Sequence, residues 1–131
     1  MQKHERWFAK ARSDLLLAQQ ALEVNNQEVF DAAIYHTQQC AEKALKGFLV
    51  FHEQQVVKTH DLDHLLFLCF KIDDEFAALY VAVGMLNPFA VELRYPDEET
   101  ESDLKPSREN LREAINVAQD LFSFVQEKIQ P

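Results

Sequence analysis

Between residues 30 and 51, side chains that suit a protein core recur every three or four positions, and this spacing constrains the fold more than any other feature. The positions are Phe30, Ile34, Thr37, Ala41, Ala44, Leu45, Phe48 and Phe51. They share one face of an α-helix, which completes a turn about every 3.6 residues. A second stripe with the same spacing is polar and partly basic and consists of His36, Gln39, Lys43 and Lys46. We therefore expect a long helix here that is the centre of both fold and function.

The rest of the chain holds three more long amphipathic segments and one short apolar segment. We expect helices over about residues 4–24, 28–52 and 61–71, a fourth that begins near residue 73, and a last one with Pro106 in its first turn. The last helix has the most regular stripe, made of Leu111, Ile115, Ala118, Phe122, Val125 and Ile129. Two glycines and four prolines leave little material for tight turns. The expected fold is all-α, an up-and-down four-helix bundle with an additional short helix, in a single domain over residues 1–131.

Residue types at the expected helix ends predict how each helix begins and stops. Asn25 and Asn26 should end the first helix, and Thr59 or Asp61 should cap the third. Pro88 should kink or interrupt the fourth. The core face of the first helix is expected to contain Trp7, Ala11, Leu15, Ala18 and Leu22.

Three short motifs follow one another along the chain. They are Gln-Gln-Cys-Ala-Glu-Lys-Ala-Leu-Lys at residues 38–46, Lys-Thr-His-Asp-Leu at 58–62 and Leu-Arg-Tyr-Pro at 93–96. Together with Trp-x(6)-Asp-Leu from Trp7, their order and spacing resemble the HEPN (higher eukaryotes and prokaryotes nucleotide-binding) domain family over almost the whole chain. The resemblance implies the same helical bundle. It also places Gln39, Glu42, Lys43 and Lys46 in the family's most recognisable motif.

Composition argues against several other classes of protein. The first six residues include charged side chains where a secretion signal would need an apolar run, and apolar positions elsewhere are periodic, so no membrane span is expected. Cys40 and Cys69 fall on apolar or helix-interior positions, which favours buried, reduced thiols and a cytoplasmic location. The only element comparable to a carboxylate–histidine metal motif is Asp61-x-x-His64, so neither a metal nor another cofactor is expected.

The charge is unevenly distributed. The chain carries a net charge of −9, and residues 73–103 hold nine acidic side chains against one basic side chain. Residues 36–60 instead hold three lysines, three histidines and two glutamates. Because phosphate backbones are bound largely through lysine and arginine, we do not expect duplex DNA as a ligand. A local pocket for one phosphate group is compatible with this distribution.

Three groups of residues are candidates for nucleotide binding. In the first, Lys43 and Lys46 would hold a phosphate beside His36 and Gln39; the alternative is a solvated helix face on which Glu42 pairs with Lys46. The second group, Lys58 and His60 at a helix N-terminus, could form an anion site or belong to a capped helix start. The third, Arg94 with Tyr95, could bind phosphate or a base, or Arg94 could be a salt-bridge hub.

Catalytic members of the HEPN family are metal-independent ribonucleases that carry an arginine followed, after four to six residues, by a histidine. Histidine would transfer protons there, and arginine would stabilise the developing negative charge. None of the five arginines of this chain has a histidine five to seven positions later; after Arg94 that window reads Glu-Thr-Glu. No catalytic residue is therefore assigned.

The leading interpretation is a non-catalytic HEPN protein that binds a nucleotide or an RNA end in a complex. The resemblance implies a minimal nucleotidyltransferase as the partner, in some cases as a toxin–antitoxin couple, and a homodimer. Some apolar side chains lie off the expected stripes, which also favours a surface that a partner covers. They are Phe67, Phe89, Leu104 and Phe124. Two alternatives stay open: a ribonuclease toxin with an atypical site around His36, Lys43, His60 and Arg94, and a structural dimerisation module without a ligand.

Overall fold

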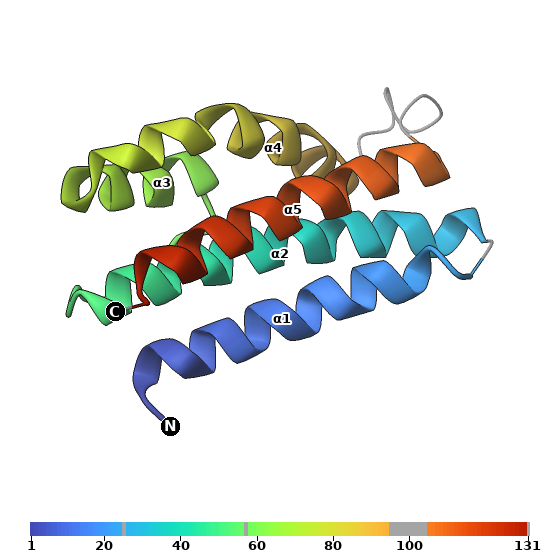
Figure 1. Cartoon of the computed structure of the whole chain (residues 1–131). Coiled ribbons are helices and arrows are strands. Elements are labelled where there is room, and N and C mark those ends of the chain that lie inside the picture. The colour runs from blue at the N-terminus through green and yellow to red at the C-terminus, as the bar shows by residue number, and fades with distance from the viewer. Residues whose placement is uncertain (25, 57, 95–104, 131) are drawn as a thin grey trace.

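The computed structural model describes residues 1–24, 26–56, 58–94 and 105–130, with the backbone alone for residues 88–94. Its elements are α1 (Lys3–Ala21), α2 (Gln27–Phe51), α3 (Leu62–Ile72), the 3₁₀ helix η1 (Asp74–Leu79), α4 (Tyr80–Arg94) and α5 (Arg108–Lys128). The long helices α1, α2, α4 and α5 alternate in direction, and α3 with η1 forms the crossover from α2 to α4 (Figure 1). The predicted fold class, an up-and-down four-helix bundle with an additional short helix, is confirmed.

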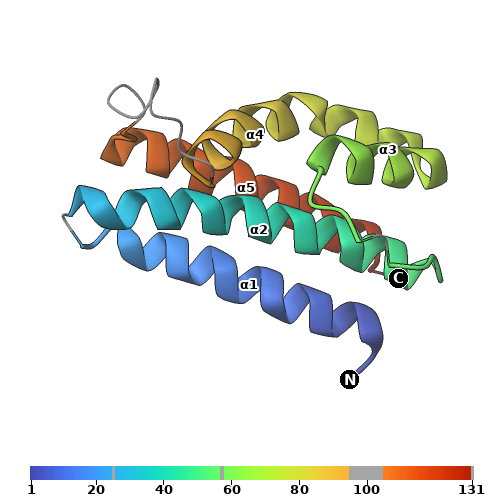
Figure 2. The same ribbon diagram turned by 180° about the vertical axis from the view of Figure 1, so that it is seen from behind.

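Helix α2 is the centre of the bundle and contacts α1, α3, α4 and α5. In both views α1 lies on one side of α2 and α5, and α3 with α4 lies on the other (Figures 1 and 2). The predicted stripe of α2 is buried from Phe30 to Phe48, whereas Phe51, at the end of the helix, is 40% exposed. The predicted stripe of α5 is buried from Leu111 to Val125.

Close approach of α1 and α2 decides which face of α1 is buried. A Cβ atom on Gly47 of α2 would lie 2.6 Å from Cε1 of Phe8 on α1, a distance that real Cβ contacts essentially never show. The absence of a side chain at Gly47 therefore makes room for the Phe8 ring, which also packs 5.9 Å from the ring of Phe122. The prediction that Trp7 belongs to the core was wrong by one position, because Phe8 is buried and Trp7 is only partly covered. Leu22, which follows the buried Ala21, is partly buried and packs against the core.

Side-chain caps fix the starts of three helices. Asn26 accepts a hydrogen bond from the backbone N–H of Glu28, so it begins α2 instead of ending α1, which stops at Ala21. Asp61 caps α3 by accepting from the N–H groups of Asp63 and His64. Ser107 caps α5 in a capping box with Asn110, and Pro106 therefore precedes the helix instead of standing in its first turn. Asn25 lies outside the described residues.

The crossover differs from the prediction at two points. The segment after Asp73 begins as the 3₁₀ helix η1 before α4 starts at Tyr80. Pro88 does not interrupt α4, which is helical through Arg94. Residues 95–104, which include part of the acidic range 73–103 and Leu104, lie outside the described residues, and the side chain of Phe89 does as well. None of the helices in the described part of the chain is both long and apolar enough to span a lipid bilayer.

Candidate functional site

The polar stripe of α2 does not face open water but lies against α1. Asp14 of α1 is only 6% exposed, and its carboxylate receives two side chains from α2. The Nδ1 atom of His36 lies 2.8 Å from Oδ1, and the ammonium of Lys43 donates to Oδ2 at 2.5 Å. Because a carboxylate only accepts hydrogen bonds, Nδ1 of His36 carries the hydrogen in this contact. We call these three residues the Asp14 cluster.

A second buried carboxylate, at the position just before Lys43 on α2, also has two partners. Glu42 is 3% exposed, and Lys46, which is 6% exposed, donates to its Oε2 atom at 3.2 Å. The Nδ1 atom of His60, in the segment before α3, lies 3.0 Å and 3.1 Å from the two carboxylate oxygens. These residues, which we call the Glu42 cluster, therefore connect α2 to the start of α3.

The structure thus brings four of the eight predicted site residues together in two pairs: His36 with Lys43, and Lys46 with His60. Gln39 lies on α2 between His36 and Lys43, and its Nε2 atom is buried without a hydrogen-bond partner. Lys58 is exposed in the segment between α2 and α3. Arg94 is the last residue of α4, with its side chain outside the described part, and Tyr95 lies outside the described residues.

Neither the phosphate-site interpretation nor the solvated-face interpretation of the polar stripe predicted the buried carboxylates that surround it. The Glu42–Lys46 pair of the solvated-face alternative exists, yet both side chains are buried. Each lysine has a carboxylate within hydrogen-bonding distance, so an incoming phosphate would compete with Asp14 or Glu42 for the ammonium groups. Both clusters hold α2 against its neighbours, and the stripe as a binding site stays a prediction.

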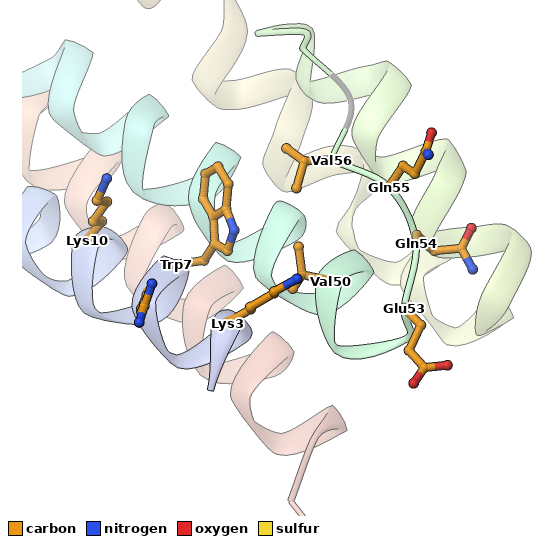
Figure 3. Close-up of a pocket in the computed structure, with 9 residues that line it drawn as sticks. Lys3, Trp7, Lys10, Val50, Glu53, Gln54, Gln55 and Val56 are labelled. Carbon is orange, nitrogen blue, oxygen red and sulfur yellow. The ribbon is translucent and has the colours of Figure 1, made fainter. Parts of the chain in front are cut away.

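Beside the Glu42 cluster the structure contains a basic pocket that sequence reasoning missed. The pocket has a volume of about 890 Å³ and is lined by Lys3, Arg6, Trp7, Lys10, Val50 and residues 53–56. Figure 3 shows α1 contributing Lys3, Trp7 and Lys10, while Val50 and residues 53–56 come from the end of α2 and the segment after it. We call it the Trp7 pocket. Its volume is in the range of small-molecule sites, about 300–1,000 Å³.

Lys46 connects the two regions. Its ammonium lies over the indole of Trp7, 5.7 Å from the ring centroid, while it also donates to Glu42. The signal that could have revealed the pocket is the spacing of Lys3, Trp7 and Lys10, which puts them on one face of α1. Placing Trp7 in the core concealed this face.

The described residues give little support to thiol or metal chemistry. Burial raises the pKa of the Cys69 thiol to about 12, and burial together with the nearby carboxylate of Asp14 raises the pKa of Cys40 to about 12. Both are buried free thiols, as predicted, and poor nucleophiles in that state. Within the described ranges, no three or more His, Cys, Asp or Glu residues are grouped so that they could hold a metal ion.

The fold and the polar contacts between α1 and α2 define this chain as an all-α helical-bundle protein. Comparison with known proteins identifies its family. The HEPN domain family model matches residues 4–128, so the chain belongs to the HEPN domain family. Among solved structures it is similar to ST0689, an archaeal HEPN homologue, with 29% identity, a TM-score of 0.76 and coverage of 99% of this chain and 100% of that one. It is also similar to TT1696 from Thermus thermophilus, with 26% identity, a TM-score of 0.76 and coverage of 98% and 100%. No match was found among curated proteins.

Proposed function

We propose that this HEPN protein binds a nucleotide or the end of an RNA without cleaving it, as one component of a complex with a minimal nucleotidyltransferase. One observation carries the proposal: basic side chains from α1 and α2 gather on one side of a chain whose net charge is −9. Lys46 of α2 meets Trp7 of α1, and Lys3, Arg6 and Lys10 line the adjoining pocket. Clustered lysine and arginine side chains are the usual means of holding phosphate.

The partner is proposed from family membership. The chain belongs to the HEPN family, whose small members are typically paired with nucleotidyltransferases, in some cases as toxin and antitoxin. A transferase that modifies nucleotides or RNA ends would be served by a HEPN chain that binds them. In this scheme the HEPN chain holds the nucleotide or RNA end and the transferase carries out the reaction. We also propose that the chain forms a homodimer.

Calorimetric titration with a dinucleotide at low salt tests binding. We expect saturable binding that Lys3→Ala, which removes a basic side chain of the Trp7 pocket, weakens by roughly tenfold, the loss of one charge-assisted hydrogen bond. Lys43→Ala and Arg94→Ala test the residues predicted from the sequence motifs and should each weaken binding to a similar extent if those side chains also contact the phosphate. Arg112→Ala is the matched control, because Arg112 lies on α5 and pairs with Glu109, so its loss should leave the affinity unchanged. Circular dichroism must show that each variant is folded, since Lys43 also contacts Asp14.

We expect the neighbouring open reading frame to encode a small nucleotidyltransferase, and co-expression of that protein with this chain tests the partner. We expect the two chains to purify as one complex. Absence of nucleotide binding by the wild-type chain, both alone and with the transferase, would leave the structural dimerisation module as the better account.

A further inference from the structure

We propose that the Trp7 pocket binds an unpaired nucleic-acid strand, with one base stacked on the indole of Trp7 and successive phosphates held by Lys3, Arg6 and Lys10. The inference rests on the proposed function, because it names the ligand class and the place where that ligand binds. It gives the binding role to α1, whereas the sequence motifs pointed to α2.

The charge of the Trp7 pocket suits a polyanionic ligand. Of the charged side chains that line it, Lys3, Arg6 and Lys10 are basic and Glu53 alone is acidic. All three basic residues are exposed, and they lie at helical positions i, i+3 and i+7 of α1. Seven residues of α-helix rise about 10 Å, so the three cations cover more than one phosphate of an extended strand. The pocket therefore favours an oligonucleotide over a mononucleotide.

An aromatic side chain, that of Trp7, lies among these cations. Trp7 is partly exposed, lines the pocket and faces Val50 and Val56 across it (Figure 3). Every base has a π-face, so stacking on an indole tolerates any sequence, and it is the usual partner of a positively charged groove in proteins that bind single strands. A base inside a duplex is already stacked and paired, so the pocket should discriminate against double strands.

The indole of Trp7 is supported from behind by Lys46. Lys46 is 6% exposed, does not line the pocket and has its ammonium over the indole, so it contacts Trp7 from the side of the bundle. Glu42 in turn accepts a hydrogen bond from Lys46. The Glu42 cluster therefore acts as a positioning group that holds Trp7. In this role Lys46, in the motif of residues 38–46 on α2, does not need to contact phosphate.

Trp7 is the single tryptophan of the chain, so intrinsic fluorescence reports on this pocket alone. We would titrate the full-length protein at low salt with a short single-stranded oligoadenylate, and follow the same strand by fluorescence anisotropy as an independent measure of binding. We expect saturable quenching of Trp7, weaker binding as salt is raised, and weaker binding of the same strand in a duplex.

Five variants separate the parts of the pocket. Trp7→Leu and Lys10→Ala should each weaken binding measured by anisotropy by about tenfold. Glu53→Gln removes the acidic side chain of the pocket and should tighten binding severalfold. Lys46→Met should change the emission of Trp7 in the free protein, because it removes the cation over the ring. Arg112→Ala, which removes one positive charge from α5, should bind as the wild type does.

The outcomes are distinguishable. Binding that leaves Trp7 emission unchanged and survives Trp7→Leu would overturn the pocket but leave the proposed nucleotide-binding function standing. Absence of binding to any nucleotide or oligonucleotide would overturn both. Equal quenching by a polyglutamate peptide would also overturn the inference, since it would assign the pocket to an acidic protein segment instead of a nucleic acid.

Discussion

The ammonium of Lys43 and the carboxylate of Asp14 meet at 2.5 Å in the contact between α2 and α1. Asp14 is 6% exposed, and His36 contacts its second oxygen, so both oxygens of a buried carboxylate have a partner from α2. A buried charge is tolerated when it is paired and hydrogen-bonded, and removing one partner is costly. The relationship makes Asp14 a specific link between the first two helices.

Replacing Asp14 with asparagine should therefore destabilise the protein. The amide keeps the shape of the side chain, but its NH₂ group would face a donor, either Lys43 or His36. We expect the free energy of unfolding to fall by about 1–3 kcal/mol, measured by chemical denaturation. Asp120→Asn, at an exposed position of α5, is the matched control and should change it by less than about 0.5 kcal/mol. Equal effects of the two substitutions would contradict a structural role for the Asp14 cluster.

The two glycines form a second matched pair. Alanine is a better helix former than glycine by about 1 kcal/mol, so propensity alone predicts that both substitutions stabilise. At Gly84 in α4 a Cβ would meet nothing within 4 Å, and Gly84→Ala should raise the free energy of unfolding by about 0.5–1 kcal/mol. At Gly47 the new Cβ would lie 2.6 Å from the ring of Phe8, which is buried, so Gly47→Ala should lower it by about 1–3 kcal/mol. A stabilising Gly47→Ala would show that α1 and α2 separate easily.

Periodicity predicted the helices well because the core stripes of α2 and α5 are local patterns. The spacing from Phe30 to Phe48 and from Leu111 to Val125 gives the buried face without knowledge of any partner. Periodicity could not decide whether Trp7 or its neighbour Phe8 belongs to the core. Phe8 is buried because Gly47, on another helix, leaves space for its ring. That information is not local to α1.

The polar stripe shows the same limit for function. Spacing placed His36, Lys43 and Lys46 on one face of α2, but it could not show that α1 covers this face and supplies Asp14. Where a covering helix supplies a carboxylate, basic side chains of such a stripe form ion pairs with it. The Trp7 pocket was missed for a related reason, because it forms only where α1 meets the segment that follows α2.

Both thiols should be unreactive while the protein is folded. Cys40 and Cys69 are 0% exposed, and burial raises the pKa of each thiol to about 12, so the reactive thiolate is nearly absent in mildly alkaline buffer. A chromogenic disulfide reagent should therefore detect no thiol in native buffer and two thiols per chain in denaturant. Rapid labelling of the native protein would indicate local opening around α2 or α3.

Apolar side chains on α4 provide the test of the proposed homodimer. Val81 is 76% exposed and Met85 is 49% exposed, and they lie one turn apart on the same face. We expect light scattering at micromolar concentration to give the mass of a dimer, and the double variant Val81→Glu, Met85→Glu to give a monomer. Leu16→Glu, at a 52% exposed position of α1, serves as a control for the added charge. A monomeric wild-type mass would count against the dimer, and dissociation by Leu16→Glu alone would move the interface to α1.

Purified protein should leave single-stranded RNA intact, which separates the proposed binding function from an atypical ribonuclease toxin. No arginine of the chain is followed by a histidine at the family's catalytic spacing. His36 and His60 each have a ring nitrogen within 3.0 Å of a buried carboxylate, which orients the rings toward Asp14 and Glu42. We expect incubation of a labelled RNA with protein and a chelator to give no more cleavage than buffer alone. Metal-independent cleavage that disappears in His36→Ala or Arg94→Ala, with folding preserved, would establish the ribonuclease instead.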